Sequence, residues 1–145
     1  MRQLAWLNTA PEPNKGEKAR GQKPPARIAR MKAEKLAIDL PDNPLQYLVD
    51  WLMEAGPLGV GGMGPVPISW QELEAWKRAC EVSPTAWEIR VIRDLSRDFL
   101  DQMNKSREPT CPAPYTSGAS NAEAVDAQFK KMFARMSNRK RERDG

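Results

Sequence analysis

Apolar residues recur at helical spacing in the middle of the chain. The first such stretch has apolar residues at positions i, i+3, i+4 and i+7, which are Leu45, Leu48, Val49 and Leu52. This spacing predicts a helix, with Asn43 as its cap and Pro44 at its first position. Tyr47 and Trp51 form a second apolar stripe beside the first. A helix that is apolar over so much of its surface needs more than one neighbour.

A second helix is predicted to start at Ser69. Ser69 and Glu72 have the spacing of a capping box, in which each side chain bonds the backbone N–H of the other residue, and Ile68 and Leu73 have the spacing of a hydrophobic staple. The face expected to be buried consists of Trp70, Leu73, Trp76 and Cys80.

A third helix is predicted to start near Ser83, with Pro84 at its first position and Glu88 placed to complement the helix dipole. Its apolar face consists of Trp87, Val91, Leu95 and Phe99, widened by Ile92 and Met103. Because the tryptophans lie on these apolar faces, we expect Trp70, Trp76 and Trp87 to be mainly structural.

The stretch from Gly56 to Pro67 separates the first two predicted helices and contains five glycines and three prolines. Glycine permits backbone conformations that other residues resist, and proline ends helices, so this stretch predicts a specified turn. The turn would hold the two helices at a fixed angle, with Trp51 and Met63 near one edge. No stretch of the chain alternates with period two, so no strand is expected. The predicted fold class is all-α, with a short helical bundle over residues 43–108.

Both ends of the chain differ from this middle part. Residues 1–42 are expected to form an extended basic arm: a Pro-rich tail with an apolar hook of Leu4, Trp6 and Leu7, then a short helix over 26–38 that ends before Pro41. Residues 109–120 are predicted to be a linker, and residues 121–145 a separate amphipathic basic helix. The apolar stripe of that helix consists of Val125, Phe129, Met132, Phe133 and Met136. Its basic end consists of Arg139, Lys140, Arg141 and Arg143.

The charge pattern agrees with this division. Residues 1–38 have a net charge of +6, residues 39–108 of −5 and residues 109–145 of +3. A mildly acidic centre with basic ends is typical of a folded middle that carries two solvated arms.

The residues give little support for catalysis. The chain has no histidine, so Ser-His-Asp and Cys-His arrangements are excluded, as is a metal site of the usual Cys and His spacing. Asp94 and Asp98 lie one helical turn apart among arginines, which is typical of a solvated helix face with charge pairs. Residues 59–64 are rich in glycine, but no strand precedes them as a dinucleotide-binding loop requires. We expect no enzyme activity, cofactor or metal.

Two further features bear on the environment of the protein. Cys80 and Cys111 are interpreted as free thiols in a reducing cytoplasm, with Cys80 in the core, although a disulfide between them stays open. No apolar run of about 18 residues exists, so no membrane span is expected. A middle of about sixty residues buries only about 60% of its unfolded surface, which leaves it marginal alone. A partner protein or self-association is therefore expected.

Three motifs resemble small proteins of tailed bacteriophages and prophages that are described as tail assembly chaperones or minor tail proteins. The first motif is Trp51-x-x-Glu54-Ala55-Gly56-Pro57. The second is Gly61-Gly62-Met63-Gly64-Pro65-x-Pro67-Ile68-Ser69-Trp70-Gln71-Glu72-Leu73-Glu74-Ala75-Trp76. The third is Pro84-x-x-Trp87-Glu88-x-Arg90-x-Ile92-Arg93-x-Leu95-Ser96-Arg97-x-Phe99. The resemblance covers about residues 44–115. It implies a non-enzymatic helical protein that binds the tape-measure and tail tube proteins during assembly in the host bacterial cytoplasm.

Three functions stay open at this point. The first is a tail assembly chaperone; the second is a structural minor tail or connector protein that stays in the tail of the virion. The third is a nucleic-acid-binding or host-directed regulator, which the basic ends favour but no recognition-helix pattern supports. The residues expected to bind a partner are Trp51, Met63, Phe129, Met132, Phe133 and Met136. The basic end at 139–143 is expected to act electrostatically, without sequence specificity.

Overall fold

A computed structural model describes residues 1–14, 16, 18 and 20–116 of the chain. The helix predicted over 121–145, with its apolar stripe and basic end, lies outside the described residues, as do residues 117–120 of the linker predicted over 109–120.

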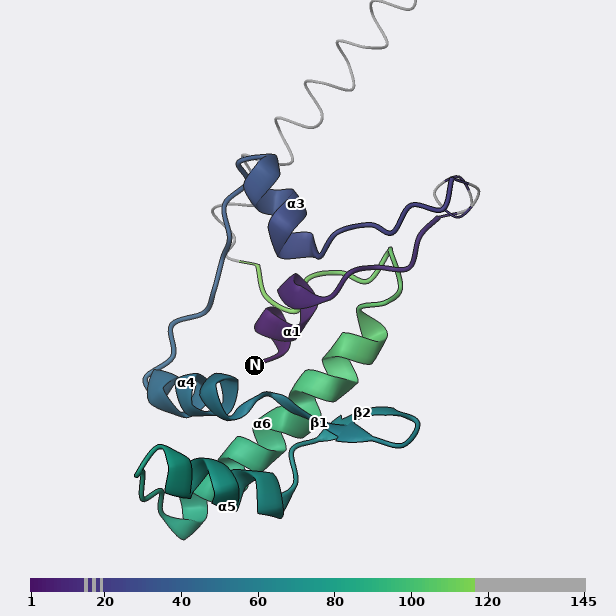
Figure 1. Cartoon of the computed structure of the whole chain (residues 1–145). Coiled ribbons are helices and arrows are strands. Elements are labelled where there is room, and N and C mark those ends of the chain that lie inside the picture. The colour runs from purple at the N-terminus through teal and green to yellow at the C-terminus, as the bar shows by residue number, and fades with distance from the viewer. Residues whose placement is uncertain (15, 17, 19, 117–145) are drawn as a thin grey trace, which may run out of the picture.

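The described residues are mostly helical. In chain order the elements are α1 (Arg2–Asn8), α3 (Arg27–Ala33), α4 (Gln46–Ala55), β1 (Leu58–Gly61), β2 (Gly64–Pro67), α5 (Trp70–Ala79) and α6 (Ala86–Lys105). Helix α6 has 20 residues and runs through the middle of the structure (Figure 1). Helices α4 and α5 lie toward its first half, and α1 lies beside its second half.

The all-α prediction is wrong in one respect, because β1 and β2 form an antiparallel hairpin. Leu58 pairs with Pro67, Gly59 with Val66, Val60 with Pro65 and Gly61 with Gly64. The hairpin lies within the stretch that was predicted to be a turn only. An alternating apolar pattern arises when one face of a strand packs on a core. So short a hairpin does not bury one face in this way, and β2 is almost wholly exposed.

One buried hydroxyl anchors the hairpin to α6. Ser96 is fully buried, and its Oγ accepts a hydrogen bond of 2.8 Å from the backbone N–H of Ile68 and donates one of 2.7 Å to the carbonyl of Pro57. Pro57 directly precedes β1 and Ile68 directly follows β2. The hydroxyl therefore closes the base of the hairpin and satisfies two backbone groups that burial would otherwise leave without partners.

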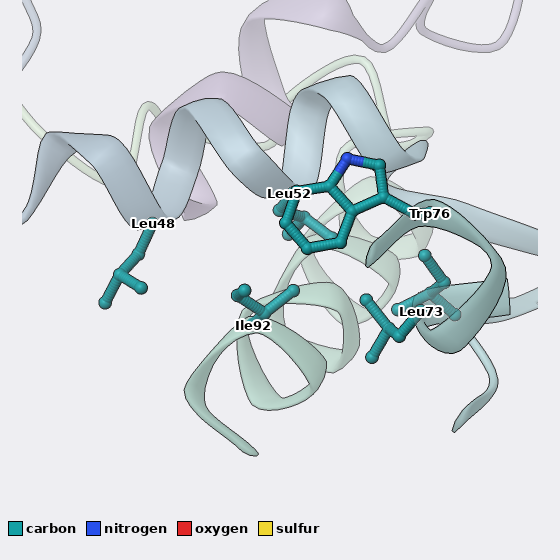
Figure 2. Packing of buried hydrophobic residues seen from close by; sticks show 6 residues of the cluster. Leu48, Leu52, Leu73, Trp76 and Ile92 are labelled. Atoms are coloured by element: carbon teal, nitrogen blue, oxygen red, sulfur yellow. The ribbon is translucent and has the colours of Figure 1, made fainter. Parts of the chain in front are cut away.

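The core lies where α4, α5 and α6 meet. It consists of Leu48, Leu52, Ile68, Leu73, Trp76 and Ile92, which converge from these helices and from the end of the hairpin (Figure 2). The indole Nε1 of Trp76 donates to a carboxylate oxygen of Glu54 at 3.1 Å, so the polar atom of this buried ring is satisfied. The expected structural role of Trp76 agrees with this position.

Three residues expected in the core are exposed instead. Trp70 is 48% exposed, Trp87 is 54% exposed and the Cys80 thiol is exposed and free. Trp70 is the first residue of α5 and Cys80 is its C-cap, so both lie at ends of the face that Leu73 and Trp76 bury. On α6 the buried positions are Ile92, Ser96, Phe99 and Gln102, a face that is rotated away from Trp87.

The predicted helix starts are partly confirmed. The capping box of Ser69 and Glu72 is present at α5. At α6 the N-cap is Thr85 rather than Ser83, and Thr85 forms its own capping box with Glu88. Asn43 does not cap α4, because its Oδ1 accepts from the N–H of Leu45 and the helix starts at Gln46.

The start of the chain is also more ordered than its composition predicts. Residues 2–8 form α1, which packs against α6 and buries Ala5 and Leu7. The apolar hook predicted around Trp6 therefore docks on this chain itself. Arg27, which was counted with the basic arm, is 3% exposed and lies at the start of α3.

Candidate functional site

The predicted partner-binding residues fall into different environments. Trp51 is partly buried, with its ring 5.1 Å from that of Tyr47 and 5.9 Å from that of Trp76, both edge to face. It therefore belongs to the margin of the core. Met63 lies at the tip of the hairpin and its side chain is fully exposed. The other residues predicted at the site lie outside the described part of the chain: Phe129, Met132, Phe133, Met136, Arg139, Lys140, Arg141 and Arg143.

The hairpin presents apolar side chains to solvent. Val60 is 95% exposed, and Met63 and Val66 are exposed beside it. The hairpin projects from the helical body (Figure 1).

Its two edges are not equivalent. Proline has no N–H, so Pro65 and Pro67 must occupy the positions of the ladder whose nitrogen points outward. Val60 lies opposite Pro65 and Leu58 opposite Pro67. These are non-hydrogen-bonded pairs of the antiparallel ladder, so Val60 and Leu58 direct their own backbone N–H and C=O groups to the outer side of β1. The outer edge of β2 is thus poor in donors, whereas that of β1 retains them.

A second surface combines tryptophan and arginine. Trp70 from α5 and Arg90, Arg93, Asp94 and Arg97 from α6 line a shallow pocket of about 220 Å³. The guanidinium carbon of Arg93 lies 4.7 Å from the centre of the Trp70 ring, within the range of a cation–π interaction. The Nε of Arg93 is buried and has no hydrogen-bond partner.

The charges of this pocket are only partly paired. Arg97 bonds a carboxylate oxygen of Asp94 at 2.8 Å on the exposed face of α6. Among the ion pairs formed between described residues, none includes Arg90 or Arg93. Guanidinium groups are planar donors that bind carboxylates and phosphates, so this pocket has the chemistry of an anion site. We call it the Trp70–arginine pocket.

Another arginine lies against a tryptophan at the opposite end of α6. Arg27 lies 5.1 Å from the centre of the Trp6 ring. Its guanidinium donates to three backbone carbonyls, those of Thr9 at 3.3 Å, Ser106 at 2.6 Å and Glu108 at 2.9 Å. Burial lowers the pKa of Arg27 from its usual value. This arginine joins α1, α3 and the end of α6 through three hydrogen bonds made within the chain.

A groove runs beside the N-terminus. One part, of about 330 Å³, is bounded by α1, by residues 40–46 and by Tyr115; a second part of about 300 Å³ continues from it toward Val91 and Leu95. Met1, Pro41, Asn43 and Val49 line both parts. Burial lowers the pKa of the Met1 ammonium, an effect that the nearby Asp98 opposes. The groove is mainly apolar and contains no arrangement typical of catalysis.

Two carboxylates with lowered pKa values, Glu72 and Glu88, are explained by helix capping. Backbone and side-chain hydrogen bonds from Ser69 lower the pKa of Glu72, and those from Thr85 lower the pKa of Glu88. The hydroxyl of Tyr47 donates to Glu88 at 2.8 Å, which further stabilises that carboxylate and raises the pKa of Tyr47. These shifts belong to structural contacts and do not indicate an acid–base pair.

Two negative findings hold for the part of the chain that the structure describes. No group of three or more Cys, His, Asp or Glu residues in it is arranged to hold a metal ion. None of its helices is long and apolar enough to cross a membrane.

Sequence reasoning missed the Trp70–arginine pocket. Arg90, Arg93 and Arg97 recur at helical spacing and were interpreted as a solvated face. The spacing does show that they share a face, but only the packing of α5 against α6 brings Trp70 to it. That contact joins residues about twenty positions apart and leaves no signal in a local pattern.

Searches against protein families, curated proteins and solved structures find no match for this chain.

Proposed function

We propose that this chain is a non-enzymatic bacteriophage tail assembly chaperone, which binds tail tube, tape-measure or neighbouring minor tail proteins through exposed apolar side chains. The observation that carries the proposal is the position of the Gly61–Pro65 motif. This motif carries much of the resemblance to tail assembly proteins, and it forms the tip of a projecting hairpin with Met63 fully exposed.

The hairpin is suited to contact rather than to packing within the chain. Val60 and Met63 contribute nothing to the core, although exposure of large apolar side chains is unfavourable unless a partner covers them. Methionine adapts its shape to irregular surfaces, which suits a protein that holds incompletely assembled partners. Because Ser96 fixes the base of the hairpin, binding would require little additional ordering of its stem.

The open edge of β1 supplies a second element of recognition. An extended segment of a tail protein can add to β1 through main-chain hydrogen bonds, with Val60 beside it. The prolines of β2 exclude the same mode of binding at the other edge. We propose that this polarity sets the side from which a partner approaches.

The proposal is tested with the variant Val60→Asp/Met63→Asp. Co-expressed with the tail proteins of its phage, the unaltered chain should co-purify with one of them, and the variant should not. Both residues are exposed, so the circular dichroism spectrum and melting temperature should not change. Leu36→Asp, which adds a charge at another exposed apolar residue, is the matched control and should retain the complex.

The structural alternative has its own readout. Mass spectrometry of purified particles should lack this chain if it is an assembly chaperone, and should show it in fixed copy number if it is a minor tail or connector protein. Retained binding by Val60→Asp/Met63→Asp, together with loss of binding by Phe129→Asp/Phe133→Asp, would move the contact to the C-terminal stripe.

A further inference from the structure

We infer that the Trp70–arginine pocket binds a carboxylate side chain, Asp or Glu, presented by a partner protein. This inference rests on the proposed function only in that the partner is a protein. The recognition chemistry is that of the pocket itself.

Arg93 supplies the first step of the argument. Its guanidinium is held against the Trp70 ring, so its plane is oriented before any ligand arrives. Its Nε is buried without an acceptor and is not open to a ligand, but no ion pair between described residues includes Arg93, so the terminal N–H groups of its guanidinium are the donors left for a ligand. An oriented guanidinium with unfilled donors loses little side-chain freedom when it binds a carboxylate.

Arg90 and Arg97 extend the site along α6. Arg90 is exposed and lies one turn before Arg93 on the wall of the pocket. Arg97 lies one turn after it, but it bonds Asp94 at 2.8 Å. An incoming carboxylate can therefore bind Arg90 and Arg93 directly. Arg97 can bind it only after its bond to Asp94 is broken. Asp94 thus competes with the ligand for Arg97 and weakens binding.

Trp70 supplies the apolar wall. It is the first residue of α5, and the capping box of Ser69 and Glu72 fixes the turn to which it belongs. Its ring is about half exposed although Arg93 lies on it. A methylene group or a neighbouring leucine of the ligand can pack on this exposed part, which favours an acidic side chain within a peptide over a free inorganic anion.

The surrounding charge favours a protein carboxylate over a nucleic acid. Helix α6 carries Arg90, Arg93, Arg97 and Lys105 against Glu88, Asp94, Asp98 and Asp101, and residues 39–108 have a net charge of −5. Nucleic-acid surfaces neutralise several successive phosphates and need an extended basic face. Here acidic residues alternate with the arginines, so a single carboxylate fits where a polyanion would meet repulsion.

The test uses the indole N–H signals of the full chain in a two-dimensional NMR spectrum, with the Trp70 signal assigned from Trp70→Phe. The probe is an acetylated Ala-Glu-Leu-Glu-Ala peptide; the matched control peptide has glutamine in place of glutamate. We expect the glutamate peptide to shift the Trp70 signal and leave that of the buried Trp76 unchanged. The glutamine peptide and inorganic phosphate should have at least about fivefold weaker effects.

The variants separate the pocket from general surface charge. Arg90→Gln and Arg93→Gln should each weaken binding of the glutamate peptide by about fivefold or more, since each removes charged hydrogen bonds. Arg78→Gln makes the same change of net charge at an exposed arginine of α5, and it should have no effect. Arg78 contacts Glu74 of its own helix, at 3.9 Å through the carboxylate and at 3.4 Å through the backbone carbonyl. Asp94→Asn should strengthen binding by about two- to fivefold, because it releases Arg97.

Four results would overturn the inference: equal shifts with the glutamate and glutamine peptides, equal losses in Arg78→Gln and Arg90→Gln, tighter binding of a single-stranded oligonucleotide at Trp70, or no shift at roughly 10 mM peptide. Arg90 is exposed, so Arg90→Gln keeps the test valid if Arg93→Gln is less well folded. None of these readouts involves tail proteins. If the hairpin variant keeps its partner, the proposed function is contradicted. If the peptide does not bind, only the inference about the pocket is contradicted.

Discussion

Two arginine–tryptophan pairs flank α6, and their geometry is nearly the same. The guanidinium of Arg27 lies 5.1 Å from the Trp6 ring centre, and that of Arg93 lies 4.7 Å from the Trp70 ring centre. Their surroundings differ. Arg27 is 3% exposed and donates to three carbonyls, whereas Arg93 is partly exposed and its buried Nε has no partner.

The difference shows that contact with an aromatic ring does not by itself assign a role to an arginine. What separates the two pairs is whether the donors are satisfied within the chain. Arg27 is buried, and its hydrogen bonds hold α1, α3 and the end of α6 together. At Arg93 the ring orients a cation whose hydrogen bonds remain to be made, which is why we assign binding to that end and stability to the other.

The largest expected effect is that of Arg27→Gln. This variant loses three charged hydrogen bonds and leaves the carbonyls of Ser106 and Glu108 inadequately paired, which should cost about 2–4 kcal/mol of unfolding free energy. Urea denaturation measures it. A loss below about 1 kcal/mol would remove the distinction between the two arginines.

A smaller effect is expected for Trp6→Leu. The indole Nε1 of Trp6 donates to the carbonyl of Cys111 at 3.0 Å, and its ring covers Arg27, so the variant should lose about 1–2 kcal/mol. Trp70→Leu is the matched variant of the other pair. Its unfolding free energy should fall by only about 0.5–1 kcal/mol, because the indole N–H of Trp70 makes no hydrogen bond that the variant would lose. Equal losses in denaturation would contradict the comparison.

Acidification should separate the pairs further. The pKa values of Glu72 and Glu88 are lowered by their capping bonds in the folded state, so their contribution to stability is fully present above the unfolded pKa of about 4.3 and is lost as pH falls through the lowered values. Glu72 caps the helix that carries Trp70, whereas no carboxylate bonds Arg27. Below pH 4.3 the Trp70 indole signal should therefore change before that of Trp6, and Glu72→Gln should remove much of this pH dependence. Simultaneous change of both signals would argue against separate behaviour.

The smallest effect is expected for Arg93→Gln, which should change the unfolding free energy by less than about 0.5 kcal/mol, because the lost contact with Trp70 is offset by removal of an unpaired buried donor. Thermal denaturation of this variant beside Arg90→Gln measures it. A loss as large as that of Arg27→Gln would make Arg93 a structural residue.

Local signals in the sequence identified most of the helices. The capping box at Ser69 is formed by residues three apart, so it could be recognised without knowledge of the fold. The start of α6 was placed two residues early because Ser83 and Thr85 are both good caps, and only the box with Glu88 decides between them. The period of the apolar residues placed Leu48, Leu52 and Leu73 correctly in the core.

Features that depend on distant contacts were not predictable in this way. The hairpin has no alternating pattern, since backbone pairing and Ser96 hold it rather than an apolar face. Arg27 appeared to belong to a basic tail, because its partners at residues 106 and 108 are about eighty positions away. Of the predicted binding residues, Met63 is fully exposed, whereas the prediction for Trp51 did not account for its contacts with Tyr47 and Trp76.

The anchoring of the hairpin by Ser96 has a consequence for how this chain can diverge. The segments that enter and leave the hairpin are both bonded to the Ser96 hydroxyl. The residues between these two points therefore form a loop whose ends are fixed, and a change within it does not alter the packing of the helices. Lengthening such a loop is inexpensive, since each doubling adds only about 0.6 kcal/mol of closure entropy. Residues can thus be inserted or exchanged between Gly61 and Gly64 while α4 and α5 keep their places. Reach and specificity at the tip can evolve independently of the scaffold.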